Sequence, residues 1–138
     1  MDKKILLTIK GNHISADGEQ HSIEFVTEGR LFQKDGVHYI EYEESAISGK
    51  EGTKTLIAID NNSVSMERTG TSFSHLFFEP GKSYVNNLMT PYGILQMGII
   101  PTRIKYEYNE EQGRLDLVYQ MAIDGKTAGT NELTFFYK

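Results

Sequence analysis

The chain has 138 residues, 38% of them apolar and 24% charged, which is typical of one folded domain spanning residues 1–138. A net charge of −5 argues against a nucleic-acid-binding protein, because such proteins bind mainly through basic contacts to phosphate. The absence of cysteine excludes disulfides, thiolate metal sites and a cysteine nucleophile.

The first predicted strand spans residues 3–10. Its apolar run, residues 5–9, is too short for a signal sequence, and no stretch of the chain approaches the length of a membrane helix. We therefore expect a cytoplasmic protein that contacts neither membrane nor nucleic acid. The one candidate basic patch contains Lys3, Lys4 and Lys10, and we interpret it as a solvated face.

Turn signals divide the rest of the chain into short segments. Asp-Gly occurs at residues 17–18, 35–36 and 124–125, and Asn-Asn at 61–62; these pairs favour tight hairpin turns because they tolerate positive φ. Between the turns, apolar and polar residues alternate as they do on strands. We predict strands over residues 3–10, 20–33, 37–46, 53–60, 63–69, 72–79, 83–89, 94–109, 114–124 and 127–137.

The short connections make consecutive strands antiparallel neighbours. An open sheet of this length would expose two edges, and closure removes them. The predicted fold is therefore all-β, an antiparallel up-and-down meander barrel of about 8–10 strands, with a β-sandwich as the alternative.

Two prolines should shape the second half of the chain. Pro101 falls within a predicted strand and cannot donate to a ladder, so we expect a bulge, bend or break there. Thr90 to Gly93 should form a four-residue turn, with Pro91 presetting φ at its second position. This interpretation leaves little support for a catalytic loop.

Arg68 is the most specific candidate for a functional residue. It shares a predicted strand face with Val64 and Met66, so it should enter the interior if they do. A buried arginine needs a partner. Two interpretations stay open: an anchor for an acidic ligand inside the barrel, or a structural plug near one mouth that is paired to a glutamate.

Other polar side chains could join Arg68 around a ligand. His75 lies in register with Phe73 and Phe77, and a packed or rim histidine is the simpler interpretation. Tyrosines can place polar tips on apolar bodies within a pocket. The predicted ligand-lining set is Arg68, His75, Tyr84, Tyr106 and Tyr119.

The acidic segment around Glu41, Glu43 and Glu44 has two interpretations. Paired carboxylates serve glycoside hydrolysis or hard metals, but a solvated face is more common. Both faces of this segment are mixed, so alternation does not decide which one is inside. We predict no metal, no cofactor and no catalytic residue.

The segment EPGKSY, residues 79–84, imitates part of a phosphate loop. The motif requires a glycine five residues before Gly81, where this chain has Leu76, and the following residues are predicted as a strand rather than a helix. We interpret the segment as a Pro-Gly turn.

The chain resembles the YwiB-like family of small bacterial proteins over residues 3–138. The resemblance is carried by an ordered series of segments and by the closing strands: YEES (42–45), EGTKT (51–55), ERTG (67–70), FFEPGK (77–82), TPYGILQMGI (90–99), and the tail LDLVYQMAIDG with NELTFFY.

This resemblance implies a closed, eight-stranded meander barrel similar to lipocalins and other calycins, if two pairs of the predicted segments merge. It implies no activity, substrate or site residue. The chain departs from secreted lipocalins because it has no tryptophan for their Gly-x-Trp signature.

The leading hypothesis is a non-enzymatic barrel that binds a small, partly apolar ligand in its interior. The alternative is a structural or protein-interaction module with a filled barrel. A third is an enzyme whose site at the mouth uses Arg68, His75 and a glutamate. An eight-stranded barrel is just wide enough either to be filled or to hold one small ligand.

Overall fold

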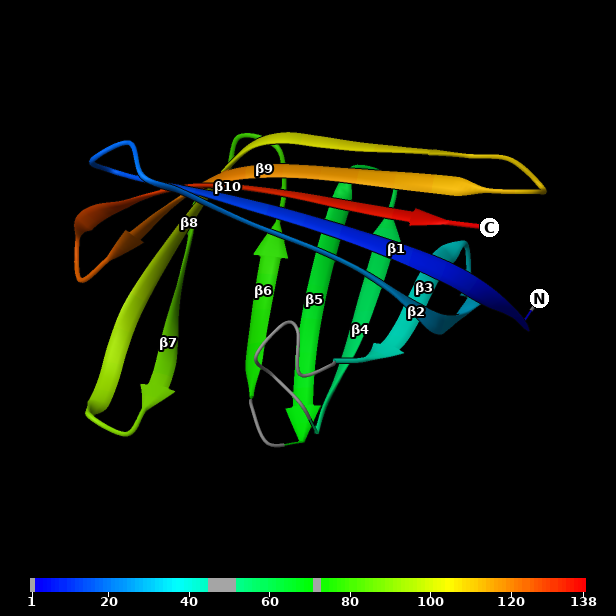
Figure 1. The fold of residues 1–138 in the computed structure, drawn as a ribbon, viewed down its shortest axis with the longest axis horizontal. Helices are drawn as coiled ribbons and strands as arrows, with labels where there is room; N and C mark the ends of the chain where they lie inside the picture. Colours follow the sequence, from blue (N-terminus) through cyan, green and yellow to red (C-terminus); the bar gives the residue numbers. More distant parts are fainter. Residues whose placement is uncertain (1, 45–51, 71–72) are drawn as a thin grey trace.

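The computed structural model describes residues 2–44, 52–70 and 73–138. Within these ranges the chain forms strands and no helix, and so none that could cross a membrane (Figure 1). The ten strands are β1 (Asp2–Ser15), β2 (Gln20–Lys34), β3 (Val37–Glu43), β4 (Thr53–Asp60), β5 (Ser63–Gly70), β6 (Ser74–Phe78), β7 (Tyr84–Thr90), β8 (Gly93–Tyr108), β9 (Gly113–Ile123) and β10 (Lys126–Tyr137).

All ten strands belong to one antiparallel sheet in the order β6-β5-β4-β3-β2-β1-β10-β9-β8-β7. The N-terminal and C-terminal strands pair in the middle of this order, from Leu7 opposite Tyr137 to Ser15 opposite Gly129. The two edge strands, β6 and β7, contact each other, although no ladder joins them among the described residues. The sheet is therefore a nearly closed barrel, as predicted, with ten separate strands instead of eight.

Tight turns explain why the strands stay separate. Asp35 and Gly36 have φ of 53° and 81°, and Asp124 and Gly125 have φ of 50° and 82°, as a type I′ hairpin turn requires. Asn61 also has a positive φ of 56°. These three turns reverse the chain within two residues, so the strands on either side of them stay separate.

The two prolines are accommodated as expected. The β8–β9 register shifts between Pro101 and Arg103, so the strand continues through a bulge. Thr90 pairs with Gly93 across the β7–β8 hairpin, which confirms the four-residue turn. Predicted and observed strand limits otherwise differ mainly at the ends; positions 45, 46 and 72 of the predicted strands lie outside the described residues.

The core forms because nearly every strand turns its apolar side chains inward. At its centre Ile40, Ile57, Met66 and Leu76 lie opposite one another across β3 to β6, and the first three are fully buried. Burial of each such side chain contributes about 1.5–3 kcal/mol. This layer separates two ends of the barrel that differ in filling and chemistry.

One glycine is required by the aromatic filling of the barrel. Gly113 begins β9 opposite Tyr137, and a Cβ atom at position 113 would overlap the Tyr137 ring. The Tyr137 hydroxyl is 2.7 Å from the Tyr106 hydroxyl. The Tyr137 ring is therefore positioned by packing against Gly113 and by a hydrogen bond from its hydroxyl group.

We expect Gly113→Ala to lower the free energy of unfolding by about 2 kcal/mol, within the usual range for overpacking. Gly98→Ala is the matched control, because a Cβ there would meet the Ala122 side chain at an ordinary 3.7 Å. Urea denaturation of the two variants checks this. Equal midpoints for both would show that Tyr137 does not need the glycine.

Candidate functional site

A row of polar side chains crosses four strands at one end of the interior. The register places Tyr42 of β3 opposite Thr55 of β4, Thr55 opposite Arg68 of β5, and Arg68 opposite Ser74 of β6. Directly opposed residues of antiparallel strands point to the same face of the sheet. Because Tyr42 and Thr55 are buried, this face is the interior, and Arg68 enters it as its alternation with Val64 and Met66 predicted.

Glu44 directly follows β3 and supplies the carboxylate that Arg68 needs. Its side chain is only 3% exposed. Its Oε1 accepts a hydrogen bond from the Thr55 hydroxyl at 2.7 Å and from Arg68 Nε–H at 3.5 Å, and the Tyr42 hydroxyl also hydrogen-bonds this carboxylate. The buried charge is therefore both paired and hydrogen-bonded, which is the condition for keeping it away from water.

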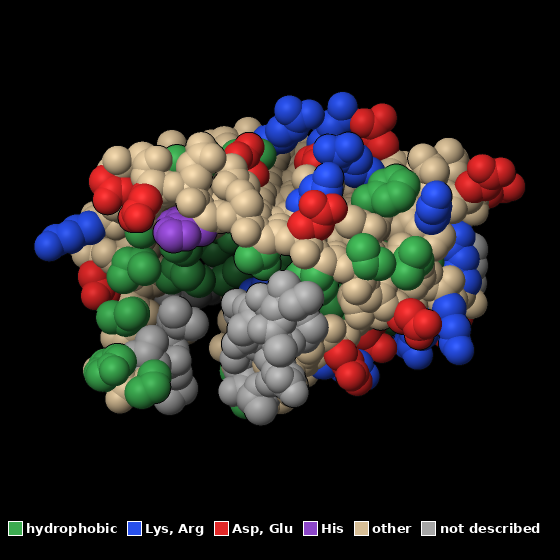
Figure 2. Space-filling view, in the orientation of Figure 1, with side chains coloured by type: hydrophobic (Ala, Val, Ile, Leu, Met, Phe, Trp, Pro, Cys, Tyr) green, Lys and Arg blue, Asp and Glu red, His purple; other side chains and the backbone are tan. Residues whose placement is uncertain are grey.

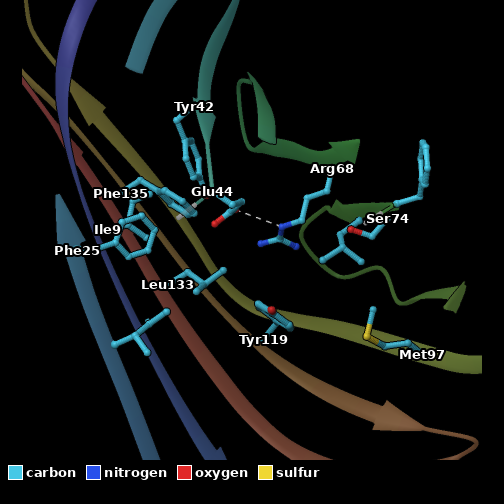
Figure 3. A pocket seen from close by; sticks show the side chains of 14 residues that line it. Ile9, Phe25, Tyr42, Glu44, Arg68, Ser74, Met97, Tyr119, Leu133 and Phe135 are labelled. Carbon is cyan, nitrogen blue, oxygen red and sulfur yellow. Dashed lines mark hydrogen bonds and ion pairs between the residues drawn. The ribbon is translucent and has the colours of Figure 1, made fainter. Parts of the chain in front are cut away.

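The guanidinium of Arg68 is only partly engaged by this carboxylate. Its side chain is 17% exposed, and its contact to Glu44 is made through Nε. Within the part of the chain that the structure describes, the two terminal nitrogens make no hydrogen bond, and Figure 3 shows the guanidinium directed toward the space between Glu44 and Tyr119. Up to four N–H donors therefore face this space.

The space is a pocket of about 360 Å³, near the lower limit for small-molecule sites. On the face drawn in Figure 2, the surface is hollowed beside the β7–β8 hairpin and hydrophobic side chains line the hollow. The pocket lining is mostly apolar, with Ile9, Ile23, Phe25, Leu76, Met97, Leu133 and Phe135 around the polar groups Tyr42, Glu44, Arg68, Ser74 and Tyr119.

Both tyrosines of the pocket stay protonated at neutral pH. Burial raises the pKa of Tyr42, and the nearby Glu44 charge raises it further. Burial also raises the pKa of Tyr119, against the opposing effect of the Arg68 charge. Their hydroxyls are neutral, so the pocket combines one ion pair with neutral donors and acceptors.

Two of the five predicted lining residues lie near the seam between β6 and β7 and not around the Arg68 pocket. His75 is exposed on the outer face of β6, with its ring 4.2 Å from that of Phe77. Tyr84 is half-buried against Phe77, with ring centroids 5.7 Å apart, and its hydroxyl hydrogen-bonds Glu79. The prediction for His75 is wrong because the core accepts Leu76 and the residues in phase with it on β6. Tyr84 lies opposite the buried Ile99, but its ring packs on Phe77 at the edge of the sheet and does not line the pocket.

The other three lie inside but at two different ends. Arg68 and Tyr119 share the pocket. Tyr106 lies at the opposite end of the barrel, where its hydroxyl is 2.9 Å from His38 Nδ1. The site predicted for an enzyme is not assembled, since His75 lies outside the pocket that holds Arg68 and Glu44.

Sequence reasoning missed the inward roles of Glu44, Thr55 and His38. Glu44 and His38 lie on the same strand face as the buried Ile40, and this alternation could have indicated that they point inward. The signal was ambiguous because the opposite face of the segment also carries aromatic and apolar residues. Glu41 faces outward and pairs with Lys54 at 3.6 Å. Among the described residues no three acidic or histidine side chains converge as metal ligands.

Comparison with known proteins places this chain in a family whose function is unknown. A family model described as "Domain of unknown function (DUF1934)" matches residues 7–135. The "Uncharacterized beta-barrel protein YwiB" of Bacillus subtilis (strain 168) is 27% identical over 125 residues, covering 91% of this chain and 87% of the relative. The predicted resemblance to the YwiB-like family is confirmed.

A solved structure supports the same likeness in three dimensions. The crystal structure of the ywiB protein from Bacillus subtilis matches with a TM-score of 0.84 at 27% identity, covering 99% of this chain and 92% of the other. The likeness extends to the whole barrel and carries no activity with it.

The ion pair should be coupled energetically. We expect Arg68→Met to lower the free energy of unfolding by about 3 kcal/mol, because it leaves the Glu44 carboxylate buried without its countercharge. The double variant Glu44→Gln/Arg68→Met should cost about 1–3 kcal/mol less than the sum of the single variants. Urea unfolding of the four proteins gives this coupling; additive costs would show that the two side chains do not interact.

His38 should make the protein less stable in acid. Burial lowers the pKa of His38, whereas an unfolded histidine keeps a pKa of about 6.5. The unfolded state therefore binds more protons than the folded state as pH falls below about 6.5, and the free energy of unfolding decreases until the lowered folded pKa is passed.

Urea midpoints measured across this pH range should fall less steeply in His38→Gln than in the wild type. The exposed His75 provides the control, and His75→Gln should retain the wild-type slope. A wild-type slope in His38→Gln would assign the acid sensitivity to other groups.

Proposed function

This chain belongs to the DUF1934 family, a domain of unknown function, and we propose that it is a cytoplasmic binding protein without catalytic activity. Its interior pocket binds a small, mostly apolar molecule that carries one hydrogen-bond acceptor, such as a carbonyl oxygen. The acceptor lies against the terminal nitrogens of Arg68, and the apolar part lies against the side chains that line the rest of the pocket.

The partly engaged guanidinium of Arg68 is the observation that carries this proposal. A structural plug would use its hydrogen-bonding groups on the protein, because unsatisfied buried donors cost about 1–3 kcal/mol each. Arg68 instead contacts Glu44 through Nε and directs its terminal nitrogens into a hollow lined by apolar side chains. A ligand acceptor would satisfy these donors where water is partly excluded.

The charge of the pocket supports a neutral ligand over the acidic one that Arg68 alone suggested. Glu44 already offsets the guanidinium charge at 3.5 Å. A second carboxylate would have to be desolvated beside the buried Glu44, and like charges in a poorly hydrated site repel strongly. A carbonyl can accept the same hydrogen bonds without this cost.

The protein-interaction module stays a second candidate because the β7–β8 hairpin carries exposed apolar side chains. Val85 of β7, Ile94 of β8 and Tyr92 in the connecting turn are all largely exposed. Apolar groups gathered on a projecting hairpin are typical of contact surfaces. This candidate predicts a protein partner and no small molecule in the pocket.

Native mass spectrometry of the purified protein should detect a bound small molecule. We expect a mass above that of the chain that disappears on denaturation, because a site with apolar walls and an anchoring hydrogen bond retains its ligand through purification. A single apo mass, together with no thermal shift across a panel of metabolites and lipids, would contradict the proposal.

Three naphthalene probes of similar size test the anchor by calorimetry. We expect 2-acetylnaphthalene to bind about tenfold more tightly than 2-ethylnaphthalene, because its carbonyl accepts a hydrogen bond from a charged donor. The carboxylate probe 2-naphthoate should bind no more tightly than the ketone, because Glu44 opposes it.

The preference for the ketone should disappear in Arg68→Met and persist in Arg114→Met, which makes the same change on the outer surface. If Arg68→Met is too unstable, Glu44→Gln/Arg68→Met replaces it. Binding of none of the three probes, or an unchanged preference in both variants, would exclude Arg68 as the anchor.

A further inference from the structure

A second cavity lies at the end of the barrel opposite the Arg68 pocket. It measures about 500 Å³ and is lined by the end of β2, the β2–β3 turn, β3, the end of β4, the β4–β5 turn and β8. His38 and Glu44 both face inward from the β3 segment and are six residues apart, which is about 20 Å along a strand. The fully buried Ile40, Ile57 and Met66 fill the interior between them, so the two cavities are separate.

His38 and Tyr106, which line this cavity, belong to a hydrogen-bonded chain of rings. His38, only 7% exposed, has its Nδ1 2.9 Å from the Tyr106 hydroxyl, which in turn lies 2.7 Å from the Tyr137 hydroxyl. Burial lowers the pKa of His38 and raises the pKa of Tyr106, so both are neutral at pH 7. The chain holds the rings in place without using a charge.

Tyr108 extends these rings to the surface. Its ring stacks on Tyr106, with centroids 5.0 Å apart and planes at 25°, and contacts His38 at 4.4 Å. It is nevertheless 58% exposed. The rings of His38, Tyr106 and Tyr108 thus pack together and end in one ring that is held by its neighbours and is accessible to a ligand.

Around this ring the lining is polar and uncharged. Gln33, Asn61 and Asn62 contribute side-chain amides, and each amide offers donors and an acceptor close together. As the described residues define it, the lining contains no carboxylate, lysine or arginine. This composition disfavours a phosphate-bearing or otherwise charged ligand, which would require a countercharge.

We propose that this cavity binds a neutral saccharide. A sugar ring presents C–H groups on its face and hydroxyls around its rim. The face packs on Tyr108, and neighbouring hydroxyls exchange paired hydrogen bonds with the amides of Gln33, Asn61 and Asn62. A flat, neutral nucleobase is the nearest competing ligand, and an experiment separates the two.

The test titrates the full-length protein with methyl β-D-glucopyranoside and with cellobiose, observed by ¹H–¹⁵N correlation spectra. We expect saturable shifts with affinities on the order of millimolar, confined to the side-chain amides of Gln33, Asn61 and Asn62 and to backbone signals near Gly36 and His38. Shifts with adenosine instead of either sugar would overturn the assignment to saccharides.

Matched variants locate the binding. Tyr108→Ala should weaken sugar binding at least tenfold, and Asn62→Ala should weaken it to a smaller degree. Tyr92→Ala, the same change at the exposed tip of the β7–β8 hairpin, and Arg68→Met, in the other pocket, should leave it unchanged. No saturable shift with either sugar at tens of millimolar, or equal binding by Tyr108→Ala and the wild type, would overturn the proposal.

Discussion

Burial of the Glu44 carboxylate is the constraint on which one end of this barrel depends. An ion away from water requires both a countercharge and hydrogen bonds. Arg68 supplies the charge at 3.5 Å, and Thr55 and Tyr42 supply the hydrogen bonds. Once Arg68 is drawn inward by this carboxylate, its remaining donors face the pocket. The polar groups of the pocket are therefore those that compensate the buried charge of Glu44.

Inward-facing side chains fill the barrel in successive layers along its length. The two ends differ because their layers contain different side chains. Apolar side chains close the centre, from Ile40 across to Leu76. At one end the hydrogen-bonded rings of Tyr106 and Tyr137 occupy the interior beside a polar cavity, and Gly113 leaves room for the Tyr137 ring. At the other end, the row of polar side chains from Tyr42 to Ser74 leaves the Arg68 pocket open. The fold thus carries two cavities of different polarity that share no lining residue.

Much of this arrangement could be predicted because turns specify register. The Asn61 turn reverses the chain between β4 and β5, and counting outward from it pairs Thr55 with Arg68. Strand alternation then places Arg68 on the same face as Met66. The parity of β3 could not be predicted, since apolar residues occur on both of its faces; packing against the rest of the core decided it. The same ambiguity on β6 led to the wrong side for His75.

The sequence by itself determined an all-β chain of antiparallel neighbours, because its turn residues and two-residue alternation define consecutive strands joined by short connections. It also placed Arg68 on the same strand face as Val64 and Met66. Only the tertiary structure decided which carboxylate meets Arg68, that Tyr119 joins it while Tyr106 lies at the opposite end of the barrel, and that the sheet ends in a seam between β6 and β7. These contacts join strands that are distant in the chain, and they depend on how strongly the sheet curves. Local sequence patterns do not determine this curvature.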